Sequence, residues 1–151
     1  MTNKTSIENI MIRDCTESDF DVVIQLLQQL WPERNLNLQA LKSVFNVGLA
    51  SLDQYYLLSL INGEATGFCS IGIRMSLYAE GNLAHIDELV VDESFRGMGI
   101  GKIFLEKAKI ISKERGCEKI ELESALHRDE AHRFYEKHGF EKAGFVLTTT
   151  V

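Results

Sequence analysis

The stretch that decides the fold is Ile86-Asp-Glu-Leu-Val-Val-Asp-Glu-Ser-Phe-Arg96-Gly-Met-Gly-Ile-Gly101-Lys102. It reads as an apolar strand followed by a glycine-rich turn, and the turn opens a helix. Glycines at 97, 99 and 101 let the backbone come close to a ligand. The helix start adds unpaired N–H groups and the positive end of a dipole. With Arg96 and Lys102 as flanking cations, the stretch predicts a phosphate cradle.

Two common phosphate-binding motifs are excluded at named positions. A P-loop requires Gly, four residues and then Gly-Lys-Ser/Thr, but Arg96 and Ile103 stand at its anchor positions. The dinucleotide motif Gly-x-Gly-x-x-Gly fails at Lys102 when it starts at 97, and at Phe104 when it starts at 99. A dinucleotide domain also opens with a parallel βαβ unit, whereas this loop comes only after residue 86. A glycine-rich strand–helix turn with no ligand remains the alternative.

Residues 1–151 are expected to form a single domain, because no repeat, linker or low-complexity tract divides the chain. Asn62-Gly63 predicts a hairpin turn. The order β-α-α-β-β-β-α-β-α-β indicates an α/β fold with a mixed, mostly antiparallel sheet flanked by helices. The predicted strands are Ile10–Arg13, Tyr55–Ile61, Ala65–Met75, Leu83–Val91 and Lys119–Glu123, with one or two more in Phe140–Thr149; the predicted helices run from Thr16 to Trp31 and over Leu38–Leu49, Gly99–Arg115 and Asp129–Lys137.

Composition excludes several classes of function. A net charge of −6 and a pI near 5.2 argue against a nucleic-acid or anionic-membrane partner. Met1–Asn9 is polar, and no apolar run reaches the length of a membrane span, so a cytoplasmic protein is expected. The cysteines are odd in number and the histidines lack ligand spacing, so neither a disulfide nor a metal site is predicted; a metal held with the help of Glu88 and Asp87 stays open. The three cysteines, expected to be small buried residues, are Cys15, Cys69 and Cys117.

A second informative segment is Ala131-His-Arg-Phe-Tyr135-Glu-Lys-His-Gly-Phe140. Its periodicity predicts a short amphipathic helix closed by Gly139. Together with Arg96-x-x-Gly-x-Gly101, it resembles the two signature segments of the GNAT N-acetyltransferase superfamily. The resemblance covers about residues 10–149 and is nearest to the small-molecule branch, namely aminoalkylphosphonate and aminoglycoside 6′-N-acetyltransferases. Many members carry Asn three residues before the second segment, whereas Arg128 stands there in this chain.

The resemblance implies an enzyme that moves the acetyl group of the cosubstrate acetyl-CoA to a primary amine. It implies that Tyr135 protonates the coenzyme sulfur, as a phenol with an ordinary pKa near 10 is able to do. A backbone N–H of the central strand would stabilise the oxyanion. Neither segment offers a nucleophilic Cys or Ser, so direct attack in a ternary complex is expected. The implied coenzyme-binding residues are Leu89, Val90, Val91, Arg96, Gly97, Met98, Gly99, Ile100, Gly101, Lys102 and Tyr135.

Glu88 is the candidate catalytic residue on the amine side. Leu89 and Val91 share one strand face, which leaves Glu88 and Val90 on the other. A carboxyl among apolar neighbours is expected to have a raised pKa. It would serve as the base, directly or through a water, or as an anchor for the ammonium; a solvated carboxylate at a strand edge is the alternative. Weaker candidates near the acceptor are Asp87, Glu80 and His85.

Two other functions stay open at this stage. One is acetylation of proteins or peptides, which needs an open groove. The other is a silent acyl-CoA-binding sensor module. A homodimer is expected only by analogy with the family, since Trp31 and Phe45 fit either a core or an interface.

Overall fold

The computed structural model describes residues 9–151, in two compact units that divide between Glu121 and Leu122. The expectation of a polar N-terminal segment therefore lies outside the described residues, apart from Asn9. The single domain over residues 1–151 remains a prediction. The helices and strands are β1 Ile10–Asp14, η2 Glu17–Asp19, α1 Phe20–Leu30, α2 Leu38–Ala50, β2 Gln54–Ile61, β3 Glu64–Ser76, β4 Gly81–Val91, η3 Glu93–Phe95, α3 Ile100–Glu114, β5 Ile120–Leu122 and α4 Asp129–Lys137.

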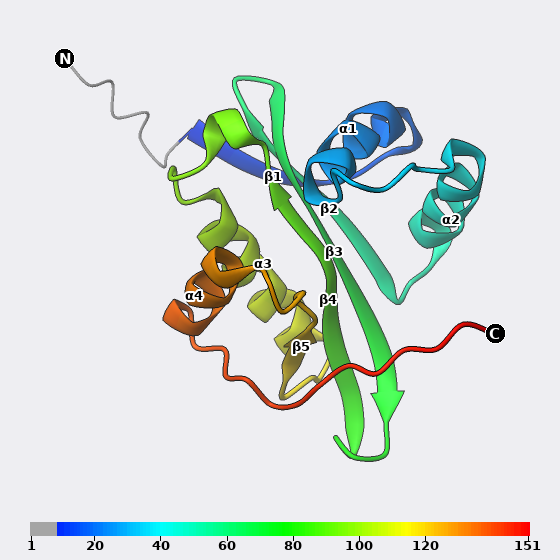
Figure 1. Cartoon of the computed structure of the whole chain (residues 1–151), viewed down its shortest axis with the longest axis vertical. Coiled ribbons are helices and arrows are strands. Elements are labelled where there is room, and N and C mark those ends of the chain that lie inside the picture. The colour runs from blue at the N-terminus through cyan, green and yellow to red at the C-terminus, as the bar shows by residue number, and fades with distance from the viewer. Residues whose placement is uncertain (1–8) are drawn as a thin grey trace. The chain divides into compact units, whose positions relative to one another are not determined.

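The sheet has the strand order β1-β2-β3-β4-β5, and β1 to β4 pair antiparallel (Figure 1). The hairpin between β2 and β3 turns at Asn62 and Gly63, whose φ angles of 50° and 79° are both positive. Such angles suit a two-residue turn that matches the twist of the strands, as the dipeptide predicts. At the other edge, the Ala84 N–H donates to the Lys119 C=O at 3.3 Å. The predicted fold class, a mixed sheet flanked by helices, is confirmed.

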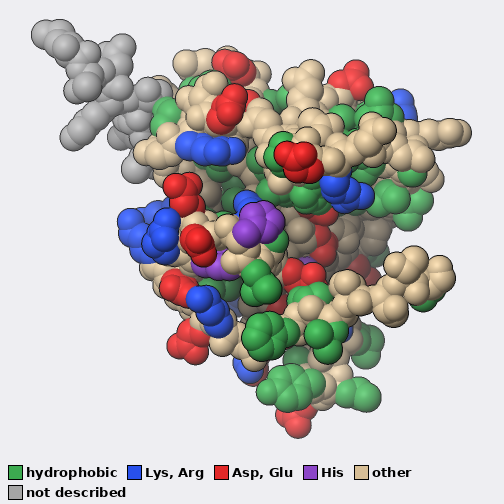
Figure 2. Space-filling model, in the orientation of Figure 1, with side chains coloured by type: hydrophobic (Ala, Val, Ile, Leu, Met, Phe, Trp, Pro, Cys, Tyr) green, Lys and Arg blue, Asp and Glu red, His purple; other side chains and the backbone are tan. Residues whose placement is uncertain are grey.

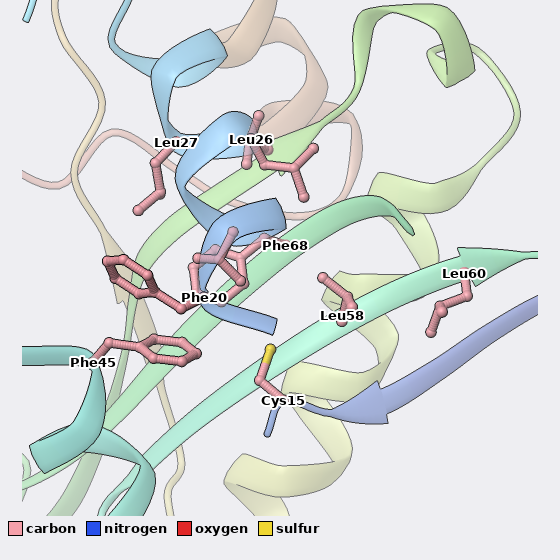
Figure 3. Packing of buried hydrophobic residues seen from close by; sticks show 10 residues of the cluster. Cys15, Phe20, Leu26, Leu27, Phe45, Leu58, Leu60 and Phe68 are labelled. Atoms are coloured by element: carbon pink, nitrogen blue, oxygen red, sulfur yellow. The ribbon is translucent and has the colours of Figure 1, made fainter. Parts of the chain in front are cut away.

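Helices α1 and α2 cover one face of the sheet, and α3 covers the other. Phe20 of α1 and Phe45 of α2 pack with Leu58 and Phe68 of the sheet in one buried cluster (Figure 3). On the opposite face, a Cβ added at Gly67 would lie 2.9 Å from the ring of Phe104 in α3. Neighbouring strand residues point to opposite faces, so Gly67 lies against α3 while Phe68 packs against α1 and α2. Phe45 is therefore a core residue and not an interface residue.

The second unit is organised around α4, whose bounds match the prediction. The Tyr135 ring lies edge-on to Phe134 and Phe140, with centroids 5.3 and 5.6 Å apart. The Tyr135 C=O accepts from the N–H groups of His138 and Phe140, both at 3.0 Å. Gly139, with φ of 92°, ends the helix in the left-handed region, as expected.

The prediction of one or two strands in Phe140–Thr149 is wrong. Residues 140–151 form no strand, and every side chain from 141 onward is exposed. Phe145 is 85% exposed and Leu147 is 92% exposed. The segment has strand-like composition, but a strand also needs a ladder partner for its backbone groups. Within the described residues this segment has none.

An apolar surface lies at the tip of the hairpin between β3 and β4. Met75, Leu77 and Tyr78 are all more than four-fifths exposed there. Figure 2 shows hydrophobic side chains gathered at the bottom of the view, where Figure 1 places this tip. Across residues 9–151, no helix is both long and apolar enough to cross a membrane.

Candidate active site

A β-bulge in β4 organises the site. Ser70 of β3 pairs with Glu88, but the next residue, Ile71, pairs with Ile86. Strand β4 therefore carries one extra residue, Asp87, opposite its partner. A bulge of this kind sends two consecutive side chains to one face of the sheet. Simple alternation, which predicts opposite faces for Asp87 and Glu88, fails at this point.

Hydrogen bonds show that both carboxylates lie on the face that α1 and α2 cover. Asp87 accepts from Gln54 Nε2 at 3.2 Å, and the Ser70 hydroxyl donates to Glu88. Gln54 pairs with Gly72 across the ladder, and Tyr56 pairs with Ser70, so these contacts belong to one face. The prediction that Glu88 shares a face with Val90 is consistent with this arrangement.

Glu88 lines a cavity of about 70 Å³ between this face and the two helices. The other lining side chains are apolar or aromatic, and Glu88 is the only charged group among them. They come from α1 and its C-cap residue Trp31, and from α2, β2 and β3: Phe20, Val23, Ile24, Leu27, Trp31, Leu41, Val44, Phe45, Tyr56 and Phe68. Apolar side chains with one convergent charged group are the lining typical of a small-molecule site, while the cavity is smaller than the about 300–1,000 Å³ that such sites usually enclose.

The surroundings of Glu88 act on its pKa in opposite directions. Burial raises the pKa of this carboxyl above its ordinary value, and the nearby Asp87 charge raises it further. The hydrogen bond from Ser70 and the proximity of His85 oppose this rise. Burial wins, so the pKa is raised, as the apolar neighbours of Glu88 predict. A carboxylate with a raised pKa is better matched to accepting a proton near neutral pH.

Asp87 has a different environment. Its Oδ1 lies 2.9 Å from His85 Nδ1, and its Oδ2 accepts from Gln54. Burial raises its pKa, but the bonds to His85 and Gln54 together outweigh burial, so the pKa is lowered. The bulge thus brings together two carboxylates whose pKa values move apart, an arrangement common at acid–base sites. Glu80, by contrast, lies in the exposed turn at the opposite end of β4.

The glycine loop follows β4 after the short helix η3 and leads into α3. Gly97 and Gly99 have φ angles of 80° and 86°, and a Cβ at either position would meet only open space. The first helical hydrogen bond runs from the Ile103 N–H to the Gly99 C=O at 3.1 Å. The amides of Ile100, Gly101 and Lys102 therefore precede the helical ladder, as an anion cradle requires.

The cations of this loop are exposed. Arg96 Nε donates to the Val91 C=O at 3.2 Å, which ties the loop to the end of β4. The Lys102 ammonium lies 4.0 Å from Glu106 one turn along α3. Met98 is half-buried between the two glycines. Leu89, Val90 and Val91 end β4 immediately before the loop and pair with β3.

Gln29 of α1, which the sequence did not single out, fixes the start of the loop. Its Nε2 donates to Asp92 Oδ2 at 2.8 Å, and its Oε1 accepts from the Glu93 N–H at 3.0 Å. Asp92 also caps η3 by accepting from the Ser94 N–H at 2.9 Å. A glutamine in an amphipathic helix carries no sequence signal for such a contact across 63 residues.

Tyr135, the predicted acid, lies in the second unit. It is buried, and the aromatic contacts described above fix its ring. Arg128 is the N-cap residue of α4 and is half-buried. Across residues 9–151, no group of three His, Cys, Asp or Glu side chains could hold a metal ion. Burial raises the pKa of the Cys15 thiol to about 12 and that of Cys69 still further, which keeps both thiols protonated.

Known proteins resemble this chain along most of its length. The model of the acetyltransferase (GNAT) family matches residues 20–140. The aminoalkylphosphonate N-acetyltransferase of Salmonella typhimurium is 33% identical over 137 residues, which cover 91% of this chain and 88% of that protein. The glucosamine 6-phosphate N-acetyltransferase of Trypanosoma brucei brucei is 30% identical over 138 residues, covering 90% and 92%.

Solved structures agree in fold. The crystal structure of a transcriptional regulator from Bacillus halodurans C-125 matches with a TM-score of 0.85 and 25% identity, covering 94% of this chain and 99% of that one. The resemblance carried by the two signature segments is therefore confirmed, and the chain belongs to the acetyltransferase (GNAT) family.

Proposed function

We propose that this protein moves the acetyl group of acetyl-CoA to the primary amine of a small molecule by direct attack in a ternary complex. The observation that carries the proposal is Glu88, the single charged group lining an otherwise apolar pocket, on the strand that leads into the glycine loop. The strand that carries the proton acceptor for the amine would thus lead to the cradle for the coenzyme diphosphate.

The chemistry assigns a role to each group. Glu88 takes a proton from the ammonium, directly or through a water, because only the neutral amine is nucleophilic. The amine nitrogen then bonds to the thioester carbon, and a backbone N–H in Leu89–Val91 stabilises the oxyanion. When the carbon–sulfur bond breaks, Tyr135 gives its phenol proton to the departing thiolate. The attacking nitrogen then gives up its extra proton, which returns through solvent to the Tyr135 phenolate. Glu88 releases its own proton to solvent, and the amide and free coenzyme A leave.

The pocket also favours an acceptor with a negative group. The Arg34 guanidinium lies 4.9 Å from the ring centroid of Trp31, and the Lys42 ammonium lies 5.5 Å from that of Phe20. Both rings line the cavity that Glu88 lines, so the pocket carries an acid inside and cations over its walls. An amine with a phosphorus oxyanion has the complementary charges, and the acceptors named for both relatives above are of this class.

The test measures thiol release from acetyl-CoA against a panel of amines. Aminoalkylphosphonates and amino-sugar phosphates are expected to turn over best, ahead of aminoglycosides, polyamines and peptides. Glu88→Gln is expected to lower kcat/KM by about 100-fold or more. Glu64→Gln, an exposed acid of the β2–β3 hairpin, is the matched control and should leave the rate unchanged. Turnover restricted to peptides would move the function to protein acetylation.

A second candidate is a catalytically silent acyl-CoA-binding module. It is kept because one structural neighbour is named a transcriptional regulator, a name that states no reaction. Tight acetyl-CoA binding without turnover of any amine would support this candidate and overturn the proposed transfer of the acetyl group. The proposed homodimer and cytoplasmic location are separate predictions, for which sedimentation of the purified chain and cell fractionation are the measurements.

A further inference from the structure

Ser70 makes two hydrogen bonds with one residue, Glu88. The Glu88 backbone N–H donates to Ser70 Oγ at 3.0 Å, and the Ser70 hydroxyl donates in turn to Oε2 of the Glu88 carboxylate. Ser70 has no exposed surface, and it stands directly opposite Glu88 in the ladder. The hydroxyl therefore bridges the backbone and the side-chain end of the same residue across two strands.

The bridge lies at the last regular pair before the bulge. Beyond it, the register between β3 and β4 shifts by one residue. A glutamate side chain has three rotatable bonds, and holding it in one conformation costs entropy that the bond to a partner must offset. Ser70 supplies that partner from a position without exposed surface. The carboxylate accepts this hydrogen bond at one oxygen. Its remaining lone pairs are left to accept a hydrogen bond from the ammonium group of the substrate amine.

We propose that Ser70 is a positioning residue that fixes the Glu88 carboxylate toward the acceptor pocket for the proton transfer. The inference rests on the proposed function of Glu88. It is supported by the effect of the same hydrogen bond on acidity, since Ser70 lowers the pKa that burial raises. Loss of the hydroxyl would therefore free the carboxylate to rotate and leave its pKa higher than in the native protein.

A second buried hydroxyl pair provides the contrast. Ser59 of β2 is also without exposed surface, and its Oγ lies 2.9 Å from Thr66 Oγ1. Both partners are neutral, and neither lines the pocket of Glu88. Ser59→Ala therefore removes a buried strand hydroxyl with a similar cost to folding and with no effect on Glu88. It is the matched control for Ser70→Ala.

The experiment combines two readouts on the full chain. The first is the pH titration of the Glu88 carboxyl carbon by NMR, with the signal assigned through its loss in Glu88→Gln. The second is the pH profile of kcat/KM with the best amine of the panel. Ser70→Ala is expected to raise the midpoint of both curves by about one pH unit and to lower kcat by roughly 10-fold. KM should change less than kcat, because binding of the acceptor is retained.

The controls separate positioning from folding. Ser70→Thr keeps the hydroxyl and should restore both the titration midpoint and kcat. Ser59→Ala should leave both readouts at native values even where it lowers the melting temperature as much as Ser70→Ala. If Ser70→Ala matches Ser59→Ala in titration and rate while Glu88→Gln remains inactive, the role of Ser70 is overturned and that of Glu88 stands. If Glu88→Gln keeps the native rate, the base assignment fails, and the positioning role fails with it.

Discussion

Gly48 of α2 lies directly against Tyr56 of β2. A Cβ added at position 48 would lie 2.5 Å from two ring carbons of the tyrosine, closer than real Cβ atoms come to neighbouring heavy atoms. The Tyr56 ring stacks on Phe45 with a centroid separation of 5.2 Å and an interplanar angle of 3°. All three residues belong to the helix and strand beside the Glu88 pocket. Glycine at 48 therefore keeps α2 close to the sheet.

Gly48→Ala should destabilise the fold and impair acceptor binding. Alanine favours the helix by up to about 1 kcal/mol over glycine, but overpacking costs about 1–3 kcal/mol, and the clash is expected to win. The free energy of unfolding measured in urea should fall, and KM for the amine should rise, since Tyr56 lines the pocket. Gly144→Ala, where a Cβ meets only open space, is the control. An unchanged KM would show that α2 can shift away from the sheet without weakening binding of the amine.

Tyr135→Phe should lower kcat by about 10-fold or more, because the phenol proton is lost while the ring contacts remain. Steady-state rates at saturating acetyl-CoA measure the effect. Tyr78→Phe removes a hydroxyl from an exposed ring at the hairpin tip and should behave as the native protein. An unchanged kcat in Tyr135→Phe would assign the proton to water.

Gly99→Ala should weaken acetyl-CoA binding. Gly99 has a φ of 86°, where an L side chain costs about 1 kcal/mol, so alanine would pull the loop out of its conformation. Gly116, at the other end of α3, has a φ of 72° and equally open surroundings, so Gly116→Ala carries a similar strain. Calorimetric titration should show a raised Kd for the first variant only. Equal Kd values for the two variants would show that the loop around Gly99 does not bind the coenzyme.

Asp19→Asn should cost stability at neutral pH but not in acid. Two hydrogen bonds from Arg13, at 2.7 and 2.9 Å, act with the Thr16 N–H to lower the pKa of Asp19 to about 2, against the opposing effect of burial. Because the folded pKa lies below the unfolded value of about 3.9, the stabilisation is present above pH 4 and disappears as the pH falls through 2.

Urea unfolding should therefore show Asp19→Asn to be about 2 kcal/mol less stable at pH 7, with the difference closing between about pH 4 and 2. Asp21→Asn, at an exposed acid two residues along the chain, should change little at either pH. A gap that persists unchanged at pH 2 would mean that the variant acts through packing and not through charge.

Local patterns predicted most elements of this fold. The bounds of α4, the turn at Asn62-Gly63 and the loop around Gly99 all follow from residues that punctuate the backbone in known ways. The bulge at Asp87 has no such mark, because no glycine or proline signals it and the extra residue is defined only by pairing with β3. The contact between Gln29 and Asp92 was missed for the same reason, as it depends on tertiary packing.

The tail illustrates the opposite error. Residues 140–149 have β-branched and aromatic character, yet strand formation depends on a neighbour that composition does not describe. Glu88 is an intermediate case. Alternation along residues 88–91 predicts its face correctly, but the same rule cannot predict the face of Asp87, because the bulge breaks the alternation there.

The extra residue in β4 also changes the parity of the strand. Before it, odd-numbered residues such as His85 face α1 and α2; after it, even-numbered residues such as Glu88 and Val90 do. A deletion of one residue at 87 would restore a single parity along β4. If the Glu88 carboxylate then kept its position relative to the glycine loop, His85 and the other residues before the deletion would have to move to the opposite face of the sheet. Length at this position, whichever residue stands at 87, therefore sets the face of the sheet on which the Glu88 carboxylate lies.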